Sequence, residues 1–79
     1  MLTGEQIRAA RGLGRLGQST LAELAELSVE TIKRLEKMEG PITANTATEA
    51  AIRRAFETVG VIFIDANGEG PGVRLRKGA

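Results

Sequence analysis

The first helical segment is marked by an apolar period and by its start signal. Apolar residues recur there every three or four positions: Ile7, Ala10 and Leu13. Thr3 followed by Gln6 has the spacing of a capping box, which satisfies two backbone donors at a helix start. Gly12 and Gly14 each cost about 1 kcal/mol relative to alanine inside a helix. We therefore expect a helix that begins near Thr3 and ends by Leu16.

Three further helical segments follow the first one along the chain: 18–25, 28–37 and 46–59. Ser28 and Asn45 are suitable N-cap residues for the second and third of these, because their side chains accept a backbone N–H. Gly40 and Pro41 predict the end of the 28–37 helix, and Gly60 has the position of a left-handed cap after the last helix. The last helix also carries apolar residues on one face: Ile52, Ala55, Phe56 and Val59.

The last twenty residues change from helical periodicity to β-branched residues and glycine. Segments 61–64 and 73–76 are predicted strands, and the glycine-rich segment 65–72 between them predicts a turn. The second strand alternates apolar and basic residues, whereas the first is apolar at every position. The sequence thus predicts a mainly α domain of four to five helices over 1–60, followed by a C-terminal β-hairpin over 61–79.

Composition excludes several classes of function. The chain has 79 residues and a net charge of +1, with 11 basic and 10 acidic residues, and it contains no Cys, His, Trp or Tyr. Thiolate metal sites, thiol nucleophiles and histidine acid–base chemistry are therefore excluded. No pair of carboxylates or nucleophile–base set is recognisable either. We expect a binding protein rather than an enzyme, with no metal and no cofactor.

The N-terminal residues and the apolar runs also bear on location. No apolar run approaches the roughly 20 residues that a membrane span requires. The N-terminus lacks the apolar stretch and the cleavage site of a signal peptide. We expect a cytoplasmic protein without a membrane partner.

The segment from Gly12 to Gly17 matches the glycine pattern of a dinucleotide-binding turn, G-x-G-x-x-G. That turn requires a strand before the glycines and a helix that opens within them. Here the preceding segment is predicted to be helical, and the chain is too short for a doubly wound sheet. The glycines are therefore interpreted as a helix end and a loop.

Segments 18–25 and 28–37 predict two helices joined by a tight turn, which is the arrangement of a helix-turn-helix. Ile32 and Leu35 fall on the inner face of the second helix. Its outer face carries Lys33, Arg34 and Lys37 with one acid. A short, exposed, basic helix fits the major groove of duplex DNA, which is about 12 Å wide. The alternative to DNA binding is that this face is an ordinary solvated helix surface.

The ordered spacing of these residues resembles the Cro/cI-repressor type of helix-turn-helix domain, the XRE family, over residues 5–60. The positions that carry the resemblance are 7–11, 18, 21, 22, 25 and 28–36. The resemblance implies a lambda-repressor-like bundle of four or five helices that binds duplex DNA as a dimer. It implies a sequence-specific transcriptional regulator, most simply a repressor, with a recognition helix at about 28–37.

Individual roles also follow from the resemblance. Gln18 matches a residue that contacts a phosphate at the start of the second helix, and Arg11 and Glu36 match a salt bridge between the first and third helices. The recognition helix would reach bases and adjoining backbone through Val29, Glu30, Lys33 and Arg34. Four further residues are expected to contact DNA. Ser28 and Thr31 would do so through their hydroxyls, Lys37 from the exposed helix face, and Asn45 from the start of the last helix.

Two positions depart from the family pattern. Glu26 stands in the turn where a small residue is typical, and Gly17 stands where a hydroxyl cap is common. These departures leave open a second hypothesis, a protein-binding module of the same fold, antitoxin-like or antiactivator, in which DNA binding is lost or reduced.

The predicted hairpin is too small to be stable alone. If one of its faces packs on the helices, the opposite face still carries apolar residues of the first strand. Exposed strand edges invite pairing with another chain. We expect a homodimer, with these residues at the interface: Val61, Ile62, Phe63, Ile64, Val73 and Leu75. The alternatives are a hairpin folded back on its own helices and a hairpin that contacts another protein.

Overall fold

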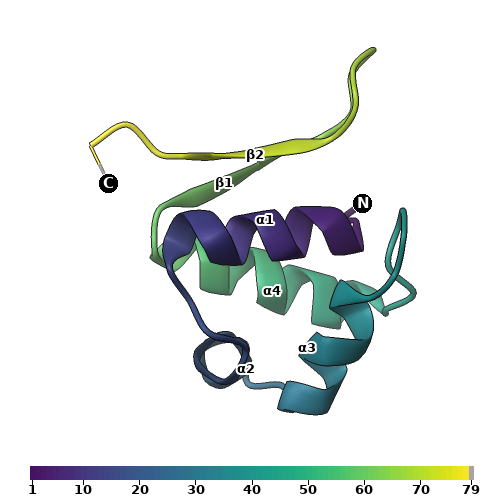
Figure 1. Cartoon of the computed structure of the whole chain (residues 1–79), viewed down its shortest axis with the longest axis vertical. Helices are drawn as coiled ribbons and strands as arrows, with labels where there is room; N and C mark the ends of the chain where they lie inside the picture. The colour runs from purple at the N-terminus through teal and green to yellow at the C-terminus, as the bar shows by residue number, and fades with distance from the viewer. Residues whose placement is uncertain (79) are drawn as a thin grey trace.

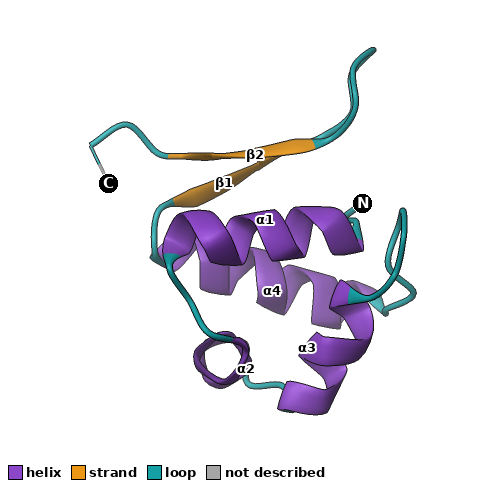
Figure 2. Ribbon diagram, in the orientation of Figure 1, coloured by secondary structure: helices purple, strands orange, loops and turns teal. Residues whose placement is uncertain are grey.

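The computed structural model describes residues 1–78. The chain forms four helices and one antiparallel hairpin: α1 Gly4–Gly14, α2 Gln18–Ala25, α3 Val29–Glu36, α4 Thr46–Thr58, β1 Val61–Ile64 and β2 Gly72–Leu75. Figure 1 shows the hairpin lying along α1, with α2 and α3 on the other side of α1 (Figure 1). The predicted fold class is confirmed at this level, a small mainly helical domain with a two-stranded hairpin (Figure 2).

The helix starts follow the predicted caps. The Thr3 hydroxyl accepts the Gln6 backbone N–H at 3.0 Å, and the Gln6 side chain accepts the Thr3 N–H at 2.9 Å, which confirms the capping box. The side chains of Ser28 and Asn45 cap α3 and α4 by accepting the backbone N–H groups of Thr31 and Thr48. The predicted 18–25 helix matches α2 at both ends.

The helix ends lie within two residues of the expected positions. The first helix stops at Gly14, and Arg15 takes a left-handed conformation at φ 56°. The third ends at Glu36 with Lys37 as its C-cap, one residue before the expected end near Lys37. The segment after α3 then pairs with the N-terminal residues. Gly40 accepts the Gly4 N–H at 3.2 Å in that pairing.

The hairpin has a register that fixes which side chains share a face. Val61 is paired with Leu75, and Phe63 is paired with Val73. The second strand spans 72–75 rather than the expected 73–76. The difference is one of boundaries, because the Arg76 N–H still donates to the Gly60 carbonyl at 2.6 Å. Gly60 has φ 88°, as its predicted role as a left-handed cap requires.

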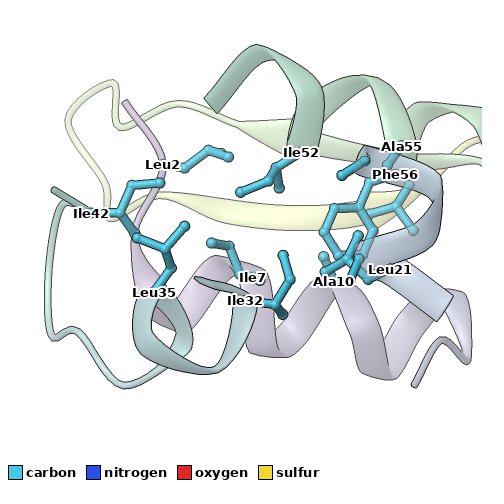
Figure 3. Packing of buried hydrophobic residues seen from close by; sticks show 13 residues of the cluster. Leu2, Ile7, Ala10, Leu21, Ile32, Leu35, Ile42, Ile52, Ala55 and Phe56 are labelled. Carbon is cyan, nitrogen blue, oxygen red and sulfur yellow. The ribbon is translucent and has the colours of Figure 1, made fainter. Parts of the chain in front are cut away.

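One apolar core joins the helices and the hairpin, and Figure 3 shows side chains from the helices and the N-terminal segment meeting in it (Figure 3). Its members are Leu2, Ile7, Ala10, Leu21, Ala22, Ala25, Ile32, Leu35, Ile42, Ile52, Ala55, Phe56 and Val61. Leu2 and Ile42 lie outside the predicted elements. They come together because the Ile42 N–H donates to the Leu2 carbonyl at 2.9 Å.

The hairpin packs against its own helices and is hydrogen-bonded to α1. The rings of Phe56 and Phe63 meet edge to face with centroids 5.4 Å apart. The Gln6 amide donates to the carbonyls of Ile64, at 3.3 Å, and Gly72, at 3.0 Å. Val61 has no exposed surface, so its expected place in a dimer interface is wrong: the core of its own chain already covers it.

No helix within residues 1–78 has the length and apolar character needed to cross a membrane.

Candidate functional site

Helices α2 and α3 are joined by only three residues, 26–28. Glu26 ends α2 in a left-handed conformation at φ 58°, and the Leu27 N–H donates to the Ala22 carbonyl at 2.9 Å. Leu27 then packs against the core, and Ser28 begins α3. Figure 1 shows α2 end-on and α3 from the side, so the short turn changes the direction of the chain sharply (Figure 1).

A charge pair ties α3 to α1. Arg11 Nε donates to Glu36 Oε2 at 2.5 Å, and Arg11 Nη2 donates to Glu36 Oε1 at 3.0 Å. The side chains are 25% and 5% exposed, respectively. The hydrogen bond with Glu36 raises the pKa of Arg11 further above its already high value, so the guanidinium stays charged. The predicted salt bridge is therefore confirmed.

The same carboxylate also holds α2. The Gln18 amide donates to Glu36 Oε1 at 3.2 Å, and Arg11 Nη1 donates to the Leu16 carbonyl at 3.0 Å. Arg8 adds a hydrogen bond to the Glu36 carbonyl at the end of α3. The three helices are thus joined through one buried carboxylate, which fixes α2 and α3 relative to α1.

Helix α3 has one buried and one exposed face. Ile32 and Leu35 are fully buried. Lys33, Arg34 and Lys37 are exposed, and none of the three forms an ion pair with another group in residues 1–78. The exposed face of α3 therefore offers three cations whose charge is not neutralised by a bonded carboxylate.

The start of α3 carries two hydroxyls and one acid. Ser28 Oγ accepts the Thr31 N–H at 3.1 Å and lies 2.8 Å from Thr31 Oγ1. Glu30 is exposed beside them. Val29 packs partly against the core, so only part of its side chain is accessible. Both hydroxyls retain accessible hydrogen-bonding capacity, but their first partners are each other and the backbone.

Two expected DNA contacts are engaged within the chain. Gln18 is half-buried, and one of its amide donors is used by Glu36. Asn45 is exposed, but its side-chain oxygen accepts the Thr48 N–H at 2.7 Å as the cap of α4. The side-chain amides of Gln18 and Asn45 therefore each keep at least one N–H that these hydrogen bonds do not use.

The surface of α2 carries exposed residues that were not predicted as binding residues from the sequence. Ser19 and Thr20 are exposed in the first turn of α2, and Gly17 provides no side-chain cap there. Leu24 is 44% exposed further along the same helix. The missing hydroxyl at position 17 was the available signal, since it leaves the first N–H groups of α2 without a side-chain acceptor.

Charge on the α2–α3 surface is balanced in number, and Glu30 lies only one helical turn from Lys33 and Arg34. Its exposed acids are Glu23, Glu26 and Glu30, and its exposed bases are Lys33, Arg34 and Lys37. The acids lie around the turn, and the bases lie in the second half of α3 and at its cap. A second basic group, Arg74, Arg76 and Lys77, lies in and just after β2, across α1 from α3 (Figure 1).

No protein-family model matches this sequence, and a search of curated proteins finds no match. Within residues 1–78, no group of three or more acidic side chains is placed to hold a metal ion.

Proposed function

We propose that this protein is a sequence-specific DNA-binding regulator, most simply a repressor, that binds duplex DNA as a dimer. In this proposal the helices form a lambda-repressor-like bundle of the XRE family, and α3 is the recognition helix. The observation that carries it is α3 itself. This short helix is held through Glu36 to α1 and α2, and it exposes Lys33, Arg34 and Lys37.

The proposed contacts divide between backbone and bases. Lys33, Arg34 and Lys37 neutralise phosphates or reach guanine edges, and hydroxyls at the helix starts hydrogen-bond to phosphate oxygens. Gly17 leaves the first turn of α2 without a side-chain cap, so its N–H groups favour an anion. Glu30 repels phosphate, so in this proposal its carboxylate accepts a hydrogen bond from cytosine N4 instead.

Selection from a pool of random duplexes at two salt concentrations tests the proposal. We expect enrichment of one palindromic site, because a dimer reads two equivalent half-sites. Binding should weaken steeply as salt rises, because each neutralised phosphate releases counterions. Absence of enrichment by the folded protein at either salt concentration would overturn the proposal.

Paired variants localise the binding to α3. The double substitution Lys33→Ala and Arg34→Ala should abolish binding at the higher salt concentration. The matched control, Arg54→Ala with Lys77→Ala, also removes two exposed cations but leaves α3 intact. Equal losses for the two pairs would show that net charge, rather than α3, governs binding.

One observation favours a second candidate, a protein-binding module of the same fold. Leu24 is 44% exposed on α2, with Glu23 and Glu26 exposed near it. An exposed leucine among carboxylates suits a protein partner better than a phosphate backbone. This candidate would gain support if the folded protein enriched no duplex and bound a protein through a surface that Leu24→Lys disrupts.

A further inference from the structure

The turn between the two strands carries an asparagine followed by a glycine, Asn67 and Gly68. Both residues are exposed, and they lie beyond the last pair of the ladder, Ile64 with Gly72. Gly68 has φ 103°, and no atom outside the adjoining residues lies within 4 Å of the place where a Cβ would stand. Among the hydrogen bonds of residues 1–78, none holds the Asn67 side chain or the Gly68 N–H. The side-chain amide and the following backbone nitrogen are therefore both accessible.

Asn45 is the other asparagine of the sequence, and its surroundings are the opposite. Its side-chain oxygen accepts the Thr48 N–H at 2.7 Å as the cap of α4, and the β-branched Thr46 follows it. A side chain held in this way is kept from swinging its carbonyl carbon onto the next backbone nitrogen, and a branched Cβ crowds that nitrogen. The two asparagines therefore differ both in restraint and in crowding.

We infer that Asn67 is a modification site, at which the chain deamidates spontaneously in water. The Gly68 nitrogen attacks Asn67 Cγ, the amide group leaves with the Gly68 proton as ammonia, and a five-membered succinimide remains. Water then opens the ring at one of its two carbonyls, which gives either aspartate or isoaspartate. Water is the only co-reactant. Glycine favours the attack because no side chain stands beside its nitrogen and its backbone turns freely.

The product adds one negative charge to the turn. The 10 acidic residues become 11, equal to the 11 basic residues, so the net charge falls from +1 to 0. The turn forms one wall of an open groove of about 920 Å³ beside α1, through Asp65, Ala66 and Pro71. Deamidation therefore makes this wall of the groove more acidic.

The hairpin is attached to the helices by contacts outside the turn. The Gln6 amide donates to the carbonyls of Ile64 and Gly72, which close the ladder, and Phe63 packs against the core. None of these contacts involves residues 66–70. The modified protein should therefore keep its hairpin and differ from the unmodified protein in the charge and backbone of the turn alone.

Peptide mapping of the aged full chain tests the inference, because trypsin places the two asparagines in different peptides, 38–53 and 55–74. The protein is incubated at mildly alkaline pH and sampled over time. Deamidation makes a peptide one mass unit heavier, and an isoaspartyl methyltransferase with S-adenosylmethionine labels the isoaspartate form. We expect peptide 55–74 to be converted at least tenfold faster than peptide 38–53. The variant Asn67→Gln should lose the mass gain in peptide 55–74.

A synthetic peptide of residues 64–72 is the unfolded reference. It should deamidate at a rate similar to that of the folded chain, and Gly68→Ala should slow both at least tenfold. A folded chain that reacts at least tenfold more slowly than the peptide would overturn the inference, because the fold would then protect Asn67. Equal mass gain in the two tryptic peptides would overturn it as well.

The variant Asn67→Asp carries the product charge from the start. Its melting curve should match that of the wild type, and a large loss of stability would contradict the separation of the turn from the contacts that hold the hairpin. These measurements involve no DNA, so they stand or fall independently of the proposed function.

Discussion

Arg11 Nε lies 2.5 Å from Glu36 Oε2, and this pair joins the first helix to the third. The Glu36 side chain is only 5% exposed, and its other carboxylate oxygen accepts hydrogen bonds from Arg11 and Gln18. A carboxylate buried to this extent depends on its partners, because an unpaired charge in the interior is costly. The pair therefore controls both the stability of the domain and the position of α3.

Removing the guanidinium tests that dependence. Arg11→Ala should lower the free energy of unfolding by about 3 kcal/mol or more, since it leaves Glu36 buried without its charge partner. Thermal unfolding followed by circular dichroism measures the change. The exposed control Arg54→Ala should change stability by less than about 0.5 kcal/mol. An unchanged melting curve for Arg11→Ala would contradict the structural role of the pair.

Gly4 allows α1 to approach the end of α3. A Cβ atom added at Gly4 would overlap the Met38 carbonyl oxygen and lie 2.8 Å from the Leu35 carbonyl oxygen. Backbone atoms cannot move aside without shifting a helix, so Gly4→Ala should destabilise the fold by about 1–3 kcal/mol. Gly12→Ala is the matched control in the same helix, because no atom lies within 4 Å of its added Cβ.

Urea unfolding of these two variants should give opposite signs. Gly12→Ala should stabilise by about 0.5–1 kcal/mol, because alanine loses less backbone entropy in a helix. If Gly4→Ala were also stabilising, α1 and α3 could not be as close as the structure has them.

Glu26 holds a left-handed conformation at φ 58° without being glycine. That conformation costs a residue with a Cβ roughly 1–2 kcal/mol, so Glu26→Gly should raise the free energy of unfolding by about 1 kcal/mol. Glu23→Gly, at an exposed position inside α2, should instead lower it by about 1 kcal/mol. Chemical denaturation of both variants measures the contrast, and a loss of stability in Glu26→Gly would contradict it.

Glu5 links the stability of the fold to pH. Hydrogen bonds from its own backbone N–H and then from the Gly40 N–H, at 3.0 Å, hold the pKa of the Glu5 carboxyl below its ordinary value. The pKa is lower in the folded state than in the unfolded state. The ionised group therefore stabilises the fold above the unfolded value of about 4.3, and this contribution is lost as pH falls through the folded value.

The comparison of wild type with Glu5→Gln isolates this contribution. The variant should be less stable than wild type at pH 7, and the difference should shrink as pH falls below the ordinary glutamate range. Urea unfolding at a series of pH values between 7 and 3 measures it. A difference that stays constant across that range would show that ionisation of Glu5 is not involved.

Local sequence signals were sufficient where neighbouring residues supply the interaction. The Thr3–Gln6 capping box, the Ser28 and Asn45 caps and the bounds of α2 depend on contacts within a few positions, and all were predicted. The Arg11–Glu36 pair spans 25 positions. It was predicted only through the family resemblance, because no local pattern joins residues so far apart in sequence.

Long-range placement was decided only by the tertiary structure. Gly40 and Ile42 pair with the N-terminal residues through backbone hydrogen bonds, and no local pattern encodes that pairing. The assignment of Val61 to the core also required the packed helices, since an apolar strand does not reveal which face is covered.

The sequence by itself determined where helices begin and which side chains share a face, because caps and periodicity act over a few residues. The tertiary structure decided which of those faces meet. Burial of Glu36 between three helices, and the free edge of β2 beside α1, depend on how elements distant in sequence pack together. That packing minimises exposed apolar surface over the whole chain, which is not a property of any single segment.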